Sequence, residues 1–129
     1  MRTVLLTALL AILGAMLCPA GQVKKLDPDQ LSRLLESEKN IFFLDVREPK
    51  EIVESGSLKG YVNIPIGELE KRLSEVPKDK VIVTACSHAV RAGRAAELLV
   101  KNGYNVAGAC AISEWKEKGK PVVYPDGKK

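Results

Sequence analysis

The stretch VIVTACSHAVRAGRAAELLV, residues 81–100, decides the fold. It begins as a run of apolar, mostly β-branched residues, which is typical of a buried strand. It continues as an alanine- and leucine-rich pattern that predicts a helix over residues 92–102. A strand that passes directly into a helix is the unit from which parallel sheets are built. The connection between them holds Cys86, the chain's single histidine, His88, and Arg91.

The rest of the chain repeats this alternation. Asp27 is a candidate N-cap, with Pro28 at the first helical position, and Gly56 and Gly103 each follow a predicted helix. Further helices are expected within residues 28–37, 49–56, 67–76 and 113–119, and strands at 41–46, 61–65, 81–85 and 104–108. The sequence therefore predicts an α/β fold with a mainly parallel central sheet flanked by helices on both faces.

Composition excludes several classes of protein. The chain of 129 residues is 46% hydrophobic and 28% charged, and it carries a formal charge of +4 with basic and acidic residues interspersed. No basic stripe is interleaved with aromatic residues, so nucleic-acid binding is not expected. Three cysteines and one histidine are too few for a disulfide scaffold or a structural zinc site. No metal or cofactor is expected, and the predicted state is a monomer.

The N-terminal segment MRTVLLTALLAILGAMLCPA, residues 1–20, has the pattern of a secretory signal peptide. Cleavage after Ala20 leaves residues 21–129 as a single domain, with 19 basic against 16 acidic residues and a formal charge of +3. The protein is therefore expected to be exported. Two alternatives stay open, an uncleaved membrane anchor and a lipoprotein signal acylated at Cys18.

Cys86 falls where open parallel sheets bind ligands, beyond the carboxyl end of a strand. Backbone amides of the turn and the positive end of the next helix form an anion-binding cradle, and such surroundings favour a thiolate. Arg91 is expected either to anchor this loop or to bind an anionic group of the substrate. The alternative for Cys86 is an inert buried cysteine. The candidate active-site loop comprises Ser87, His88, Ala89, Val90 and Arg91.

Two segments resemble the signatures of rhodanese (sulfurtransferase) domains. LDVREPKEIVESGSLKGYVNIP, residues 44–65, is similar to the first, and CSHAVRAGRAAELLVKNGYNVAG, residues 86–108, followed by Trp115, is similar to the second. The resemblance runs from Leu26 to Val123, and the exported single-domain form is similar to the periplasmic sulfurtransferases of bacteria. It implies the rhodanese fold for residues 21–129 and a periplasmic location for the exported protein.

The resemblance also implies a two-step sulfur transfer. Cys86 takes the outer sulfur of a small anionic donor such as thiosulfate, holds it as a persulfide, and passes it to cyanide or a thiol. This is nucleophilic catalysis with ping-pong kinetics. A phosphatase is disfavoured because its loop places arginine six residues after the cysteine, whereas here Arg91 comes one residue earlier.

Several residues depart from the family pattern or have a secondary role in it. Ala89 replaces a glycine, which matters if the position needs a positive φ, and Ala92 replaces a hydroxyl residue. Asp45 and Arg47 are expected to be a structural pair that positions the neighbouring loops. His88 is either a hydrogen-bond donor to an anionic substrate or an exposed loop histidine.

Cys110 replaces a family glycine after the last predicted strand. One hypothesis is that it approaches Cys86 and resolves a persulfide or forms a disulfide, as poised thiols do; the alternative is a small residue that fills space. Two other functions therefore stay open. One is a thiol–disulfide protein that uses both cysteines, and the other is a binding module whose altered loop has lost catalysis.

Overall fold

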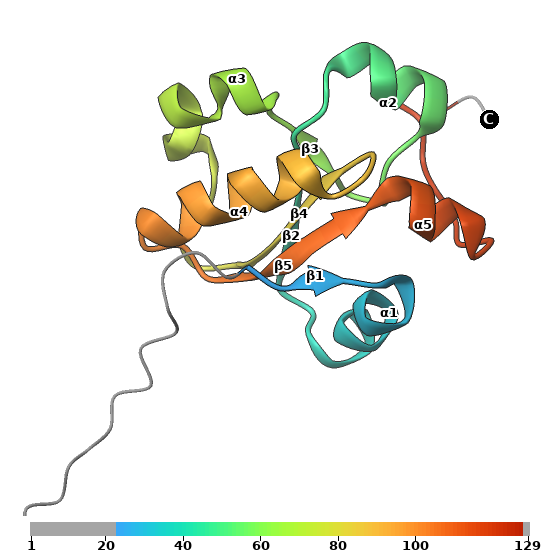
Figure 1. Cartoon of the computed structure of the whole chain (residues 1–129), viewed down its shortest axis with the longest axis horizontal. Helices are drawn as coiled ribbons and strands as arrows, with labels where there is room; N and C mark the ends of the chain where they lie inside the picture. The colour runs from blue at the N-terminus through green and yellow to red at the C-terminus, as the bar shows by residue number, and fades with distance from the viewer. Residues whose placement is uncertain (1–22, 128–129) are drawn as a thin grey trace, which may run out of the picture.

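The computed structural model describes residues 23–127, which form a parallel sheet with helices on both faces (Figure 1). The predicted signal peptide and Cys18 lie outside the described residues. Within residues 23–127 the sheet has five strands in the order β1-β5-β4-β2-β3, all parallel. The strands are β1 (Lys25–Leu26), β2 (Ile41–Asp45), β3 (Val62–Asn63), β4 (Val81–Cys86) and β5 (Val106–Ala111). The predicted fold class is confirmed.

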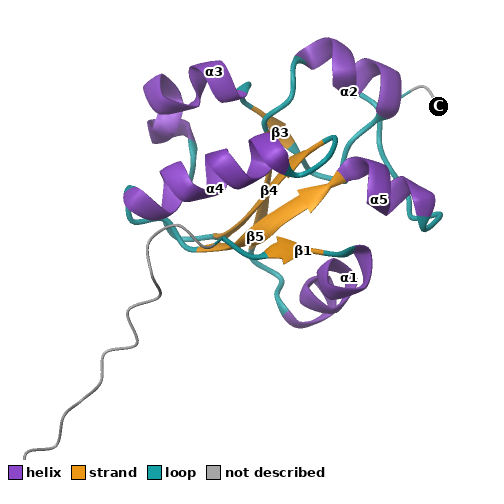
Figure 2. Ribbon diagram, in the orientation of Figure 1, coloured by secondary structure: helices purple, strands orange, loops and turns teal. Residues whose placement is uncertain are grey.

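Helices cover the two faces of the sheet, as Figure 2 shows. They are α1 (Pro28–Ser37), α2 (Pro49–Ser55), α3 (Ile66–Leu69), the 3-10 helix η1 (Glu70–Glu75), α4 (Val90–Lys101) and α5 (Ile112–Glu117). On one face Leu69 of α3 and Ala95 and Leu99 of α4 belong to one buried cluster. On the other face Leu31 of α1 and Trp115 of α5 belong to a second cluster. No helix within residues 23–127 is long and apolar enough to cross a bilayer.

The ends of α1 and α2 follow from local chemistry. The Asp27 carboxylate accepts a hydrogen bond from the Gln30 backbone N–H at 2.8 Å, and the Gln30 side chain accepts one from the Asp27 N–H at 3.0 Å. This capping box confirms the predicted start of α1. Gly56 ends α2 with φ +74°, and a Cβ there would lie 2.8 Å from Val122 Cγ2. Glycine is therefore required both by the backbone conformation and by the packing of the C-terminal segment.

The elements around Cys86 differ in length from the prediction. β4 runs through Cys86 itself, because Cys86 is in register with Ala111 of β5. β5 spans Val106–Ala111 rather than residues 104–108, and α4 begins at Val90 rather than at residue 92. The connection between β4 and α4 therefore shortens to residues 87–89. Strand pairing, which is a long-range interaction, extends both strands beyond the ends predicted from sequence.

The prediction of one continuous helix over residues 67–76 is wrong. The chain makes α3 and then η1, and Arg72 has non-helical φ −116° and ψ 19°. The Tyr104 hydroxyl donates a hydrogen bond to the Leu73 carbonyl oxygen at 2.6 Å. A partner 31 residues away in sequence thus satisfies a backbone group that local periodicity assigns to a helix.

The edge strand β1 was not predicted, and β3 is shorter than the predicted strand over residues 61–65. β1 pairs with β5 beside Gly108, where a Cβ would lie 2.6 Å from the Lys24 carbonyl oxygen. Gly108 therefore allows the backbone of β1 to approach β5. A two-residue strand carries too little periodicity to be recognised from sequence.

Candidate active site

Cys86 is the last residue of β4, at the carboxyl edge of the sheet, and it is 1% exposed. The Ala92 backbone N–H at the start of α4 donates a hydrogen bond to Cys86 Sγ at 3.2 Å. Thr84, also on β4, holds this turn of the helix, because its hydroxyl donates to the Ala92 carbonyl oxygen at 2.8 Å. The sulfur therefore accepts a hydrogen bond from the first turn of α4, next to the connection of residues 87–89, where the strand-to-helix order predicts an anion-binding cradle.

The short connection places Ala89 in a strained conformation. Ala89 has φ +70° and ψ −8°, and it is the only non-glycine residue within residues 23–127 with a positive φ. An L-residue with a Cβ pays about 1–2 kcal/mol in this region, which glycine avoids. The sequence left open whether position 89, where the family has glycine, needs a positive φ. The structure shows that it does, because Ala89 has a left-handed backbone.

We expect Ala89→Gly to stabilise the domain by about 1 kcal/mol, because the relief of left-handed strain exceeds the entropy cost of glycine. Thermal denaturation should show Tm raised by about 4–8 °C for a domain of this size. Ala95→Gly is the control, since Ala95 is buried within α4, and this change should lower Tm. An unchanged or lowered Tm for Ala89→Gly would contradict the strain.

Arg91 does not lie in the loop but in the first turn of α4, where it pairs with α2. Its Nη1 and Nη2 donate to the two carboxylate oxygens of Glu51 at 2.8 Å each. Glu51 also accepts the Glu48 backbone N–H at 2.8 Å and so caps α2. Of the two predicted roles for Arg91, this contact fits the anchor rather than direct binding of substrate. The hydrogen bond from Arg91 lowers the pKa of Glu51 from its ordinary value of 4.5 to about 2.

This ion pair predicts a specific response to acid. The pKa of Glu51 is lower in the folded state, so its contribution to stability is present above about pH 4.5 and is lost as pH falls toward 2. We expect Glu51→Gln to cost about 1 kcal/mol at neutral pH, a modest value because solvent screens this partly exposed pair. Urea denaturation at several pH values should show that the difference from wild type shrinks below pH 4.

Glu54→Gln is the matched control for this prediction, because Glu54 lies on the same helix and is exposed. It should leave both the stability at neutral pH and its acid dependence unchanged. A constant difference between Glu51→Gln and wild type from pH 7 to pH 2 would show that the Arg91 contact is not the cause.

Asp45 and Arg47 form a buried network at the end of β2. They are 0% and 1% exposed, and Arg47 Nη2 donates to Asp45 Oδ2 at 2.6 Å. The Ser57 hydroxyl donates to the same oxygen at 2.6 Å. Arg47 also donates to the Ser55 hydroxyl and to the Gly56 carbonyl oxygen, both at 2.7 Å. The pair therefore joins β2 to the end of α2, which agrees with the structural role expected from sequence.

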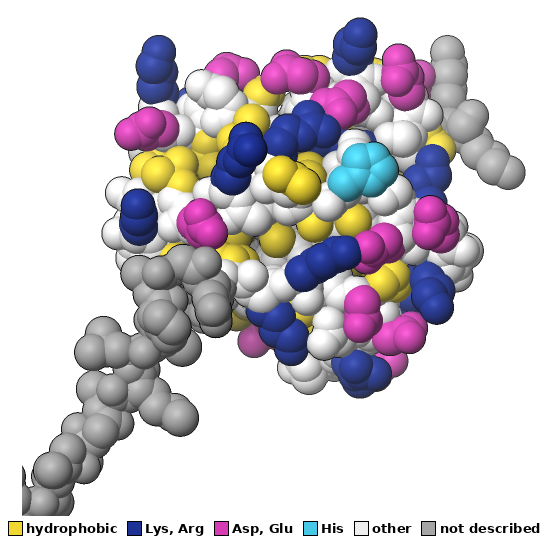
Figure 3. Space-filling model, viewed as in Figure 1, with side chains coloured by type: hydrophobic (Ala, Val, Ile, Leu, Met, Phe, Trp, Pro, Cys, Tyr) yellow, Lys and Arg dark blue, Asp and Glu magenta, His cyan; other side chains and the backbone are white. Residues whose placement is uncertain are grey.

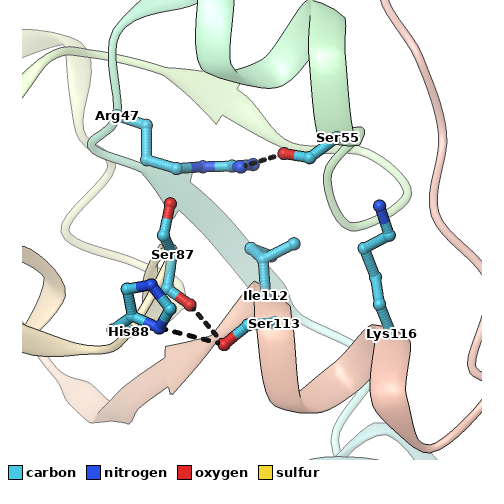
Figure 4. A pocket seen from close by; sticks show the side chains of 7 residues that line it. All are labelled: Arg47, Ser55, Ser87, His88, Ile112, Ser113 and Lys116. Atoms are coloured by element: carbon cyan, nitrogen blue, oxygen red, sulfur yellow. Dashed lines mark hydrogen bonds between the residues drawn. The ribbon is translucent and has the colours of Figure 1, made fainter.

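A pocket of about 340 Å³ lies beside the Cys86 loop (Figure 4). Arg47 and Ser55 form one wall, and Ser87 and His88 of the loop form another. The third wall belongs to α5, which contributes Ile112, Ser113 and Lys116. These residues of α5, and Ser55, were not identified from sequence. The residues of α5 lie outside both signature segments, and Ser55 lies within the first signature but has no role assigned from it. Cys86 itself is buried and is not among the residues that line the pocket.

The loop is fastened to α5 by Ser113. The Ser113 hydroxyl donates to the Ser87 carbonyl oxygen at 2.7 Å, and the Ser113 backbone N–H donates to the same oxygen at 3.2 Å. His88 Nδ1 lies 3.3 Å from the Ser113 hydroxyl oxygen. The hydroxyl hydrogen is already used, so Nδ1 must act as the donor. His88 is otherwise exposed, and it is the cyan side chain in Figure 3.

The family model of the rhodanese-like domain matches residues 27–123. The chain belongs to the rhodanese-like domain family. A sulfurtransferase of Allochromatium vinosum is 31% identical over 109 residues, which cover 81% of this chain and 99% of the relative. A mitochondrial thiosulfate sulfurtransferase of Saccharomyces cerevisiae is 33% identical over 113 residues, with 75% of each chain covered.

Solved structures agree with this assignment of the rhodanese-like domain. A rhodanese-related protein from Thermoplasma volcanium superimposes with a TM-score of 0.69 at 32% identity, covering 78% of this chain and 97% of that one. The polysulfide-sulfur transferase of Wolinella succinogenes gives a TM-score of 0.63 at 28% identity, with 78% of each chain covered.

The rhodanese-like domain does not bring Cys110 to Cys86. Cys110 is in register with Ala85, and Cys86 is in register with Ala111. Because successive side chains of a strand point to opposite faces, the two thiols lie on opposite faces of the sheet. Cys86 belongs to the core cluster beneath α4, whereas Cys110 belongs to the cluster beneath α1 and α5. Burial raises the pKa of Cys110 to about 12, which keeps it a neutral thiol near pH 7. This placement fits the space-filling interpretation of Cys110.

Proposed function

We propose that this rhodanese-like domain is a sulfurtransferase that carries sulfane sulfur on Cys86 as a persulfide. The observation that supports the proposal is the hydrogen bond from the Ala92 N–H to Cys86 Sγ, within the cradle at the start of α4. The same amide, in an unchanged position, is available to a negatively charged sulfur. Preorganised donors of this kind stabilise developing negative charge without reorganisation.

In the first step the Cys86 thiolate attacks the outer sulfur of thiosulfate or of a related sulfane donor. A new S–S bond forms to Cys86 while the S–S bond of thiosulfate breaks, and sulfite leaves with the electron pair. In the second step an acceptor, cyanide or a thiolate, attacks the outer sulfur of the persulfide. The acceptor gains the sulfur and Cys86 returns to a thiolate, so the two half-reactions follow ping-pong kinetics.

The small size of the cradle fits a sulfur atom better than a phosphoryl group. The connection consists of residues 87–89, and Arg91 is held by Glu51 through both of its terminal nitrogens. That arginine is thus occupied by a carboxylate, whereas a phosphatase needs its loop arginine for the phosphate. Cys86 is 1% exposed, so the residues that cover the sulfur have to move aside when donor and acceptor reach it.

The proposal includes export. It is supported by the sequence of residues 1–20, which has the composition of a signal peptide. The periplasm as the destination is supported by the resemblance to the periplasmic sulfurtransferases of bacteria.

The experiment that tests the proposal combines mass spectrometry with a turnover assay on residues 21–129. After exposure to thiosulfate, Cys86 should gain the mass of one sulfur atom, and addition of cyanide should remove that mass and release thiocyanate. If thiosulfate and polysulfide both leave Cys86 unmodified, the proposal is wrong, and a binding module that has lost catalysis becomes the better interpretation.

A further inference from the structure

The pocket beside the Cys86 loop presents one positive charge that nothing in the described part of the chain neutralises. Arg47 is balanced by Asp45, at 2.6 Å. Lys116 makes no ion pair with any residue within 23–127. The seven described residues that line the pocket include no carboxylate. The local electrostatic field therefore favours an anion.

Hydrogen-bond donors face the same space. Figure 4 shows the Arg47 guanidinium and the Ser87 side chain on one side of the pocket and the Lys116 ammonium on the other. The hydrogen bonds of Arg47 account for four of its five guanidinium hydrogens, which leaves one Nη1 hydrogen for a ligand. Arg47 is fixed by burial, so this donor needs no ordering when a ligand binds.

The size of the pocket is more than an inorganic sulfur anion needs. Its volume of about 340 Å³ is at the lower end of the range of roughly 300–1,000 Å³ seen for organic ligands. A water molecule takes about 30 Å³ of the liquid, so a five-atom anion would leave most of the pocket to water. Ile112 lies between Lys116 and the loop; it is 1% exposed and offers a ligand neither a charge nor a hydrogen bond, which suits a hydrocarbon segment at this point.

We infer that this pocket binds an organic thiol that carries a carboxylate and that this thiol is the sulfur acceptor. Lys116 holds the carboxylate, the hydrocarbon segment passes the side chain of Ile112, and the thiol end faces the loop at Ser87. The inference rests on the proposed function of Cys86. The acceptor thiolate attacks the outer sulfur of the Cys86 persulfide, the S–S bond to Cys86 breaks, and an organic persulfide leaves. One thiolate replaces another, so charge and oxidation state balance.

The test compares two acceptors of the same length that end in a carboxylate or in a neutral amide, 3-mercaptopropionate and 3-mercaptopropionamide. The Cys86 persulfide is first loaded with thiosulfate or polysulfide, and kcat/KM for unloading is then measured with each acceptor. The variants are wild type, Lys116→Gln and Lys116→Glu. Lys118→Glu is the matched control, because Lys118 is an exposed lysine of the same segment that does not line the pocket. Comparing the carboxylate-to-amide ratio between variants cancels the difference in thiol acidity.

We expect Lys116→Glu to lower the carboxylate-to-amide ratio about tenfold, Lys116→Gln to lower it less, and Lys118→Glu to leave it unchanged. In wild type the ratio should fall as ionic strength rises, since salt screens an exposed charge. A ratio that is the same in wild type and in Lys116→Glu, with Cys86 normally loaded, overturns the inference alone. If Cys86 takes up sulfur neither in wild type nor in any of the variants, the proposed function is overturned instead.

Discussion

Cys86→Ser should lose sulfur transfer from thiosulfate to cyanide by at least about a thousandfold, because the hydroxyl is a far weaker nucleophile than the thiolate and forms no persulfide. This is the largest expected effect on activity. The variant should keep its Tm close to that of wild type, since serine is nearly the size of cysteine. The measurement is thiocyanate formation together with the mass of the protein after exposure to thiosulfate.

Cys110→Ala is the matched control for this prediction. Cys110 lies on the opposite face of the sheet, in a cluster with Leu26, Leu31 and Trp115, and burial raises its pKa to about 12. We expect it to retain the activity of wild type to within about twofold, as a residue outside the reacting groups should. Equal loss in both cysteine variants, with a Cys86–Cys110 disulfide in the oxidised protein, would instead support a thiol–disulfide function.

The largest expected effect on stability comes from Asp45→Asn. The change leaves the Arg47 guanidinium buried, at 1% exposure, without its counterion. Breaking one partner of a buried ion pair typically costs about 3–5 kcal/mol. Because the total stability of a small domain is about 5–15 kcal/mol, thermal denaturation should show Tm lowered by tens of degrees.

Two further variants separate this effect from the loss of any ion pair. Arg72→Gln removes an exposed pair with Glu75 and should leave Tm within experimental error. The double change Asp45→Asn with Arg47→Leu removes both buried charges and should recover part of the loss, so it remains informative if the single variant fails to fold. A Tm for Asp45→Asn equal to that of wild type would show that the network contributes little.

Prediction from sequence succeeded where neighbouring residues carry the information. The β-branched run of β4, the apolar run of β2 and the Asp27–Pro28 start of α1 each predicted an element that the structure contains. Cys86 was correctly expected at the passage from β4 into α4 for the same reason. The need for a positive φ at Ala89 also follows from a local pattern, since the family places glycine there.

The candidate site was harder to predict because its parts come from distant segments. Arg91 binds Glu51, which lies 40 residues earlier, and sequence alone left both an anchoring role and a substrate-binding role open. Lys116 reaches the pocket because β5 extends to Ala111 and α5 begins at once, at the edge where the Cys86 loop lies. The spacing of neighbouring residues predicts none of these contacts.

The sequence by itself determined the α/β class, the parallel order of strands and helices, and a cysteine at the end of a central strand. These properties depend on hydrophobic periodicity and on caps, which act over a few residues. Only the tertiary structure decided which face of the sheet each thiol occupies, because a shift of one residue in strand register reverses every side chain. Register is set by pairing between β4 and β5, so Cys110 is separated from Cys86 although their strands are adjacent.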